Sequence, residues 1–144
     1  MKYLNQLQVY LSNLAVWNQK LHNMHWNVEG KLFFQLHEKT EDMYNEVFGQ
    51  FDEVAELIKI KGKLPVASLA EYVKLATLKE VESKKFTTDE VVDIIMADLT
   101  ALNELAREIR DEADKAGDFT VVMMFEEFVA NFEKNLWFLR ALNG

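Results

Sequence analysis

The sequence has no cysteine, a single proline and only five glycines among its 144 residues. Without cysteine the chain can form no disulfide and no thiolate metal site, and it has no cysteine nucleophile. The scarcity of proline and glycine, together with an apolar fraction of 49%, favours an ordered and largely helical domain with a sizeable core. We therefore expect a single domain over residues 1–144, in which any metal is held by His, Asp or Glu.

Long apolar runs and an excess of positive charge are also missing. No stretch approaches the ~20 apolar residues of a membrane span, and residues 1–6 lack the pattern of a signal peptide, so we expect a cytoplasmic protein. Lys and Arg number 16 against 24 Asp and Glu, which gives a net charge of −8. This charge opposes binding to a phosphate backbone and favours the attraction of cations.

Apolar residues recur at steps of three and four along four stretches, which is the spacing of one buried helix face. The predicted helices cover residues 2–28, 32–61, 87–116 and 119–142, with a short helix near 68–76. Thr87 and Glu90 form a capping box, Gly62 and Gly117 supply stop signals, and Asp118 can cap the last helix. The second helix is expected to bury Phe33, Thr40, Tyr44, Val47, Phe51, Ala55 and Ile58.

The lengths of the connections predict the topology. Short links join the first helix to the second and the third to the fourth, so each pair should form an antiparallel hairpin. One long segment joins the two hairpins. A four-helix bundle with a single long crossover is the ferritin-like topology. The predicted fold is therefore all-α, a ferritin-like bundle with a short helix in the crossover.

Two histidines and two acids are the candidate metal ligands. His25 and His37 stand twelve residues apart, and Asp52 and Glu56 follow at i and i+4 on the second helix. Neutral imidazoles and carboxylates together suit iron, zinc or manganese. On a helical wheel Glu41, Asp52 and Glu56 fall about 40°, 60° and 100° from His37. The ligands on the second helix therefore share one face.

One helix cannot bring His37 and Asp52 to the same ion. They are fifteen residues apart, or roughly 22 Å, whereas a bond to a first-row metal is about 2 Å. Either the histidines and acids are unrelated, or two subunits pair about a two-fold axis. In that case one subunit gives His25 and His37 and the other gives Asp52 and Glu56. The Glu-x-x-His motif of ordinary di-iron bundles precedes none of the three histidines, which argues against a di-iron site within one subunit.

The stretch from His25 to His37 reads HWNVEGKLFFQLH, and the sequence DEVAE follows at 52–56. This pattern resembles the Dps-like mini-ferritins, the iron-storing, DNA-protecting dodecamers of starved bacteria. The resemblance implies a ferroxidase that oxidises Fe(II), preferably with hydrogen peroxide, at sites shared between two subunits of a dodecameric shell. It also implies two iron ions per shared site, with zinc or manganese as substitutes, and storage of ferric mineral against oxidative stress.

Residues close to the ligands are further candidates for the site. Glu41 is expected to be an outer metal ligand or a partner of one. Trp26 and Trp137 are either plain core aromatics or, for Trp26 by resemblance, a neighbour of the site that takes up oxidising equivalents. His22 is expected to be a surface or interface residue.

Other acids are candidates for handling iron elsewhere in a shell. Glu38 and Asp42 could nucleate ferric mineral, because hard cations prefer oxygen ligands. Asp114 and Asp118 lie near the end of the third helix, where negative charge opposes the helix dipole. In similar shells acids of this region line pores, and negative pores raise the local concentration of cations.

Two other functions stay open. A DNA-compacting protein would need a basic arm, but Lys2 is the only early cation, and Lys134 and Arg140 are too few to form one. Direct DNA binding is therefore not expected unless a divalent cation bridges the two. A structural helical bundle with incidental ligand residues would take up no metal.

Overall fold

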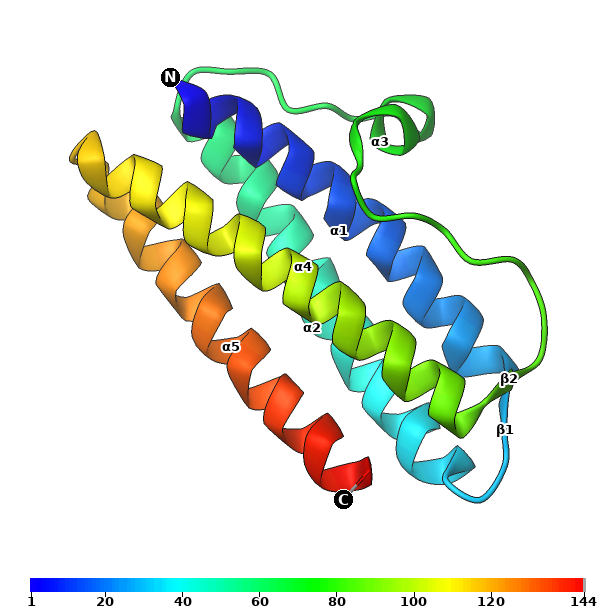
Figure 1. Cartoon of the computed structure of the whole chain (residues 1–144). Helices are drawn as coiled ribbons and strands as arrows, with labels where there is room; N and C mark the ends of the chain where they lie inside the picture. Colours follow the sequence, from blue (N-terminus) through cyan, green and yellow to red (C-terminus); the bar gives the residue numbers. More distant parts are fainter. Residues whose placement is uncertain (144) are drawn as a thin grey trace.

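The structure is a computed structural model that describes residues 1–143, with side chains as far as residue 142. Four long helices run side by side and a short helix lies in the crossover between the two hairpins (Figure 1). The elements are α1 (Lys2–Asn27), β1 (Val28–Glu29), α2 (Phe33–Ile60), α3 (Leu69–Leu75), β2 (Phe86–Thr87), α4 (Thr88–Lys115) and α5 (Phe119–Asn143). The predicted ferritin-like bundle with a short crossover helix is confirmed.

The helix ends follow from local chemistry. Thr87 and Glu90 exchange side-chain and backbone hydrogen bonds in the predicted capping box of α4. After α2, Gly62 has a φ of +81°, its N–H donates to Lys59, and the N–H of Lys63 donates to Ile58. This Schellman arrangement needs a left-handed residue and satisfies the last carbonyls of the helix. The turn at Gly117, with a φ of +73°, repeats it after α4.

The core fills the space between the two hairpins. α1 packs on α2 and on α4, and α4 packs along α5. In α4 the apolar residues spaced by three and four are all fully buried, namely Val92, Ile95, Leu99, Leu102, Ala106, Ile109 and Ala113. In α5 the large core side chains are Phe125, Phe128 and Phe132.

The predicted stripe of α2 is confirmed at Thr40, Val47 and Ile58 and is wrong at its other four residues, which are only partly buried. The buried side chains are Leu36, Thr40, Met43, Val47, Gln50, Val54, Leu57 and Ile58. Phe33, Tyr44 and Phe51 are only partly buried, because their rings lie at the edge of the core. There they pack against aromatic side chains outside it, as Phe51 does against Tyr72.

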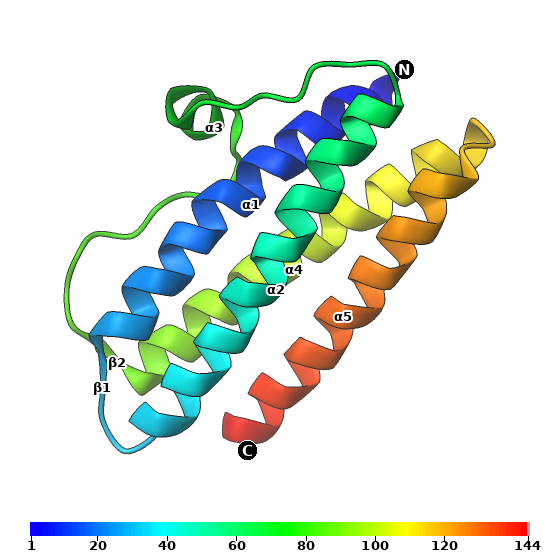
Figure 2. The ribbon, with the colours of Figure 1, turned by 180° about the vertical axis from the view of Figure 1, so that it is seen from behind.

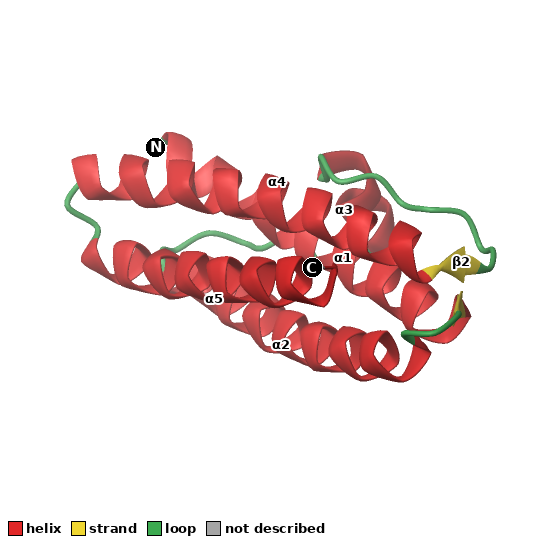
Figure 3. Ribbon diagram, turned by 60° about the horizontal axis from the view of Figure 1, so that its bottom comes forward, coloured by secondary structure: helices red, strands yellow, loops and turns green. Residues whose placement is uncertain are grey.

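The crossover is held against α1 by polar side chains as well as by partly buried apolar residues, among them Tyr72, Leu78 and Val81. Asn13 bonds Thr77 and the N–H of Leu78, and Asn23 donates to the carbonyls of Val81 and Glu82. At its end β2 pairs in parallel with β1, next to the turn between α1 and α2 (Figures 2 and 3). α3 itself has no buried residue.

A buried ion pair joins α1 to α4. Lys20 Nζ lies 2.7 Å from Asp98 Oδ2, and both side chains are largely buried. Burial raises the pKa of Asp98, although the ammonium of Lys20 works in the opposite direction. Losing either partner would leave a buried charge unpaired, which makes the pair a strong constraint on how the two helices fit together.

Asp118 ties three elements together at the end of the bundle opposite the strands. It accepts hydrogen bonds from Tyr3 at 2.8 Å, Lys61 at 2.6 Å and Thr120 at 3.1 Å. Burial raises the pKa of Asp118, but the ammonium of Lys61 and the two hydroxyls outweigh burial, so its pKa is lowered overall. Asp118 therefore stabilises the fold as a carboxylate.

We predict that Asp118→Asn destabilises the protein at pH 7 by about 1–2 kcal/mol, because charge-assisted hydrogen bonds are lost. A lowered folded-state pKa means that the stabilisation is present above the unfolded pKa of about 3.9 and is lost as the pH falls through the folded value. The gap in melting temperature between the two proteins should therefore close below about pH 4. Asp111→Asn, an exposed acid at the same end, is the control, and an equal loss of stability there would contradict the assignment.

In the part of the chain that the structure describes, no helix is long and apolar enough to cross a membrane.

Candidate metal site

His25 and His37 form one rigid unit at the end of the α1–α2 hairpin. Their rings stack with centroids 3.7 Å apart and planes 16° apart. His25 Nδ1 lies 2.7 Å from the carbonyl oxygen of His37, and His37 Nδ1 lies 2.9 Å from the carbonyl oxygen of His25. A carbonyl oxygen can only accept, so each Nδ1 carries the proton. In its neutral form each ring then presents the lone pair of Nε2, which is the form that binds a metal ion.

The surroundings of His25 favour its neutral form. Its side chain is 6% exposed, and burial is the largest effect on its pKa, which is lowered overall. Its Nε2 lies 3.9 Å from Oε1 of Glu41, which is half exposed. Glu41 therefore lies beside Nε2 of His25, the position expected for an outer metal ligand.

The structure does not bring the two predicted acids to the histidines within one chain. Asp52 and Glu56 are exposed on α2, several turns beyond His37. Over residues 1–142, no group of three or more His, Asp or Glu side chains is placed to hold a metal ion. A chain by itself thus offers two half-sites, one of imidazoles and one of carboxylates.

Aromatic rings from α1 and α2 pack around the histidine pair. His22 stacks on Tyr44 at 3.9 Å, Tyr44 meets His25 edge-on at 5.3 Å, and Trp26 lies 5.5 Å from His22. Trp26 is 62% exposed, so it is not a core residue. Trp137 is also largely exposed.

Sequence reasoning missed two neighbours of the histidines, Tyr44 and Thr40. Both were expected only as members of a buried stripe. Thr40 is fully buried, and its Oγ1 lies 3.1 Å from His25 Nδ1. A polar residue three positions after His37 was the available signal, because positions i and i+3 share a helix face.

The acids expected to nucleate mineral are exposed, whereas those expected at a pore lie beside cations of the same chain. Glu38 and Asp42 are exposed on α2, and Asp42 lines a groove of about 390 Å³ between α2 and α5. Asp114 lies 3.6 Å from Arg110, and Asp118 is bound to Lys61. Each of the two acids near the end of α4 therefore lies beside a cation of the same chain, and Arg110 also contacts Asp111 and Glu126.

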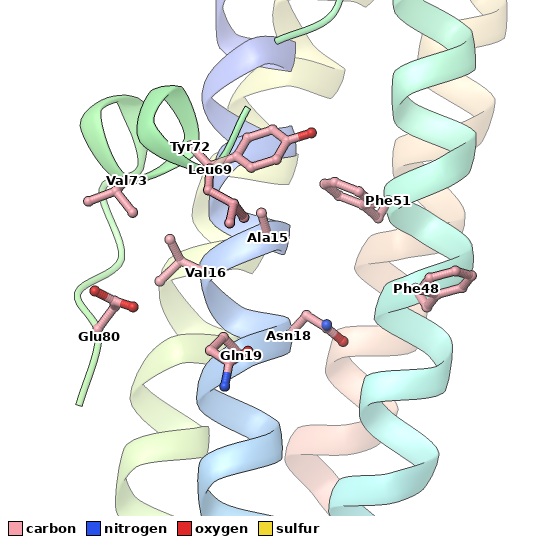
Figure 4. A pocket seen from close by; sticks show the side chains of 10 residues that line it. All are labelled: Ala15, Val16, Asn18, Gln19, Phe48, Phe51, Leu69, Tyr72, Val73 and Glu80. Carbon is pink, nitrogen blue, oxygen red and sulfur yellow. The ribbon is translucent and has the colours of Figure 1, made fainter. Parts of the chain in front are cut away.

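An apolar groove of about 460 Å³ runs between α1, α2 and α3 (Figure 4). Phe48 and Phe51 line it from α2, while Leu69, Tyr72 and Val73 line it from α3. Phe48 is 70% exposed and Leu69 is 81% exposed. Exposed apolar side chains gathered on one face are typical of a surface that another protein covers.

Comparison with known proteins places this arrangement in a family. The ferritin-like domain family matches residues 4–144. The chain is 37% identical over 133 residues to the DNA protection during starvation protein of Brevibacillus brevis, covering 91% of this chain and 87% of that protein. The chain therefore belongs to the ferritin-like proteins. Within them it is a member of the Dps group, as the sequence pattern had indicated.

Solved structures of the group have the same fold. Dps of Listeria innocua, in crystals soaked with zinc, superposes with a TM-score of 0.94 at 32% identity, covering 99% of this chain and 96% of that one. The Dps protein of Vibrio cholerae, described as a member of the ferritin-like diiron-carboxylate superfamily, has a TM-score of 0.94 at 29% identity. That match covers 99% of this chain and 89% of the Vibrio cholerae chain.

Proposed function

We propose that the protein is a ferroxidase and iron store whose metal site is completed by two subunits. One subunit supplies His25 and His37, and the partner supplies Asp52 and Glu56. The observation that carries this proposal is the pair of half-sites. Each imidazole directs Nδ1 at a main-chain carbonyl and leaves Nε2 without a hydrogen bond to the main chain. The acids are exposed on α2, the helix of His37, at a distance that one chain cannot bridge.

The spacing on α2 fixes where a two-fold axis would lie. If His37 of one subunit meets Asp52 and Glu56 of the other, antiparallel α2 helices must cross near the midpoint of these positions. That midpoint falls between Tyr44 and Val47. Phe48, the exposed phenylalanine of the apolar groove, stands one residue further on. The groove is thus in the right place to be buried by the same pairing that completes the site.

The proposed chemistry transfers two electrons at once. Two Fe(II) ions held by the imidazoles and carboxylates each give one electron to hydrogen peroxide, which takes up two protons and leaves as two water molecules. Both ions become Fe(III), and no hydroxyl radical is released. Zinc or manganese could occupy the same ligands, since His and carboxylate do not discriminate sharply among these metals. The preference for peroxide over dioxygen rests on the resemblance to the Dps group.

We also infer that Fe(III) is stored as a hydrolysed oxide inside a shell of twelve subunits in the cytoplasm. Glu38 and Asp42 offer exposed oxygen ligands on which mineral could begin to form. A pore role for Asp114 or Asp118 requires Fe(II) to compete with Arg110 or Lys61 for the carboxylate.

Protection of DNA, which the name of the Brevibacillus brevis relative states, is proposed to be indirect here. The chain carries a net charge of −8, with 24 Asp and Glu against 16 Lys and Arg. Removal of Fe(II) and peroxide protects DNA without contact, whereas neutralising its phosphates would require clustered Lys and Arg. Compaction of DNA is therefore the weaker alternative, as is a purely structural bundle.

We predict that His25→Ala, His37→Ala, Asp52→Asn and Glu56→Gln each slow Fe(II) oxidation by peroxide on the order of 10- to 100-fold, because each removes a ligand. Ferric absorbance follows the rate, and a sizing column checks that the assembly persists. Glu53→Gln, an exposed acid beside Asp52, should oxidise iron at the wild-type rate. Unchanged oxidation rates in all four ligand variants would contradict the proposed site.

We further predict that Phe48→Glu weakens the subunit pair and abolishes iron oxidation with it, because two like charges would meet near the axis. The wild-type protein should elute at a multiple of the 16.8 kDa chain mass, and the variant nearer to that mass. Ile60→Glu changes an equally exposed apolar side chain of α2 outside the groove and should keep both properties. An intact, active Phe48→Glu assembly would show that this groove is not the interface.

A further inference from the structure

Over residues 1–142, the one side chain that hydrogen bonds to the histidine pair is that of Thr40. Its hydroxyl is fully buried, and its Oγ1 lies 2.7 Å from the carbonyl oxygen of Leu36, 3.1 Å from that of His37 and 3.1 Å from His25 Nδ1. Thr40 thus stands where α2 touches the ring from α1.

The direction of these hydrogen bonds follows from the groups present. The Thr40 hydroxyl has one proton, and both nearby carbonyl oxygens can only accept, so it donates to the main chain. The lone pairs that remain can accept from His25 Nδ1. The imidazole N–H is therefore shared between the His37 carbonyl at 2.7 Å and the Thr40 hydroxyl at 3.1 Å. Every group at this nitrogen is an acceptor.

Three contacts then define the orientation of the His25 ring. His37 stacks on the face of the ring, Tyr44 meets the ring edge-on, and the Thr40 hydroxyl accepts a hydrogen bond from Nδ1. A ring rotated by half a turn would point a carbon at the Thr40 hydroxyl and lose the hydrogen bond. The observed orientation turns Nε2 toward Glu41.

We propose that Thr40 is a positioning residue of the metal site, whose hydroxyl holds the His25 ring with Nε2 facing the metal. This inference rests on the proposed function, because it takes His25 to be a ligand. It adds a residue that binds no metal itself: the hydroxyl of Thr40, on α2, acts by orienting the ligand His25. Partners of this kind fix the tautomer and direction of a ligating histidine.

A purely local role is the competing explanation. Buried or not, a helical threonine often donates to the carbonyl four residues earlier. Thr100 does so on α4, with Oγ1 2.8 Å from the carbonyl oxygen of Met96, and none of its hydrogen bonds involves a histidine. Thr100 is therefore a matched control for the loss of this backbone contact.

The test measures Co²⁺ binding to the assembled protein by its visible absorption, which reports both affinity and the geometry of the ligands. Thr40→Val keeps the shape of the side chain but removes the hydroxyl, and it should weaken Co²⁺ binding about 10-fold and alter the spectrum. Thr40→Ser restores the hydroxyl and should restore both. Thr100→Val should leave both unchanged. If Thr40→Val does not assemble, Thr40→Ala removes the hydroxyl without the β-branched methyl group and replaces it.

The outcomes separate this inference from the proposed function. Wild-type Co²⁺ binding in Thr40→Val, together with loss of binding in His25→Ala, overturns the role of Thr40 and keeps the site. Equal weakening in Thr40→Val and Thr40→Ser also overturns it, because the hydroxyl would then not matter. Wild-type binding in His25→Ala instead refutes the site itself.

Discussion

The distance along α2 between its histidine and its acids governs what this protein can do. A metal ion accepts ligands at about 2 Å, and fifteen residues of helix separate His37 from Asp52 by roughly 22 Å. No adjustment of side chains closes that gap. A site built from these residues therefore exists only where two chains meet, and iron chemistry becomes a property of the assembly.

The rest of the fold makes each half-site rigid before the chains meet. The reciprocal bonds between His25 and His37 fix both tautomers and join α1 to α2 at one end of the bundle. The ion pair of Lys20 and Asp98 fixes α1 against α4. At the opposite end of the bundle, Asp118 binds Tyr3 of α1 and Lys61 after α2. The polar anchors of the crossover leave α3 free of buried side chains, so its apolar residues remain available beside Phe48. Preorganised ligands lose little freedom when a partner and a metal arrive.

Much of this could be predicted from the sequence. Helix ends depend on local signals, and the capping box at Thr87 and the stops at Gly62 and Gly117 were found where predicted. The two histidines could be placed together because only a short link separates their helices. The stripe of α2 was predicted less well, since aromatic rings such as Phe51 satisfy an apolar pattern while lying at the edge of the core.

The contacts between distant residues could not be predicted. No periodicity shows that Thr40 faces His25, that Tyr44 lies between two histidines, or that Asp118 meets Tyr3 and Lys61. These contacts depend on the rotation of one helix against another, which the packing of the whole core determines. The exposed Trp26 is a similar case, because a large aromatic residue in a helix is more often buried.

Complementation between two inactive variants tests the shared site most directly. One chain carries His25→Ala and His37→Ala, the other carries Asp52→Ala and Glu56→Ala, and the two are assembled together in equal amounts. With random pairing about half of the two-fold dimers are mixed, and each mixed dimer regains one of its two sites. The account predicts about a quarter of the wild-type rate of Fe(II) oxidation, whereas each variant alone is inactive. No recovery in assemblies shown to contain both chains would contradict it.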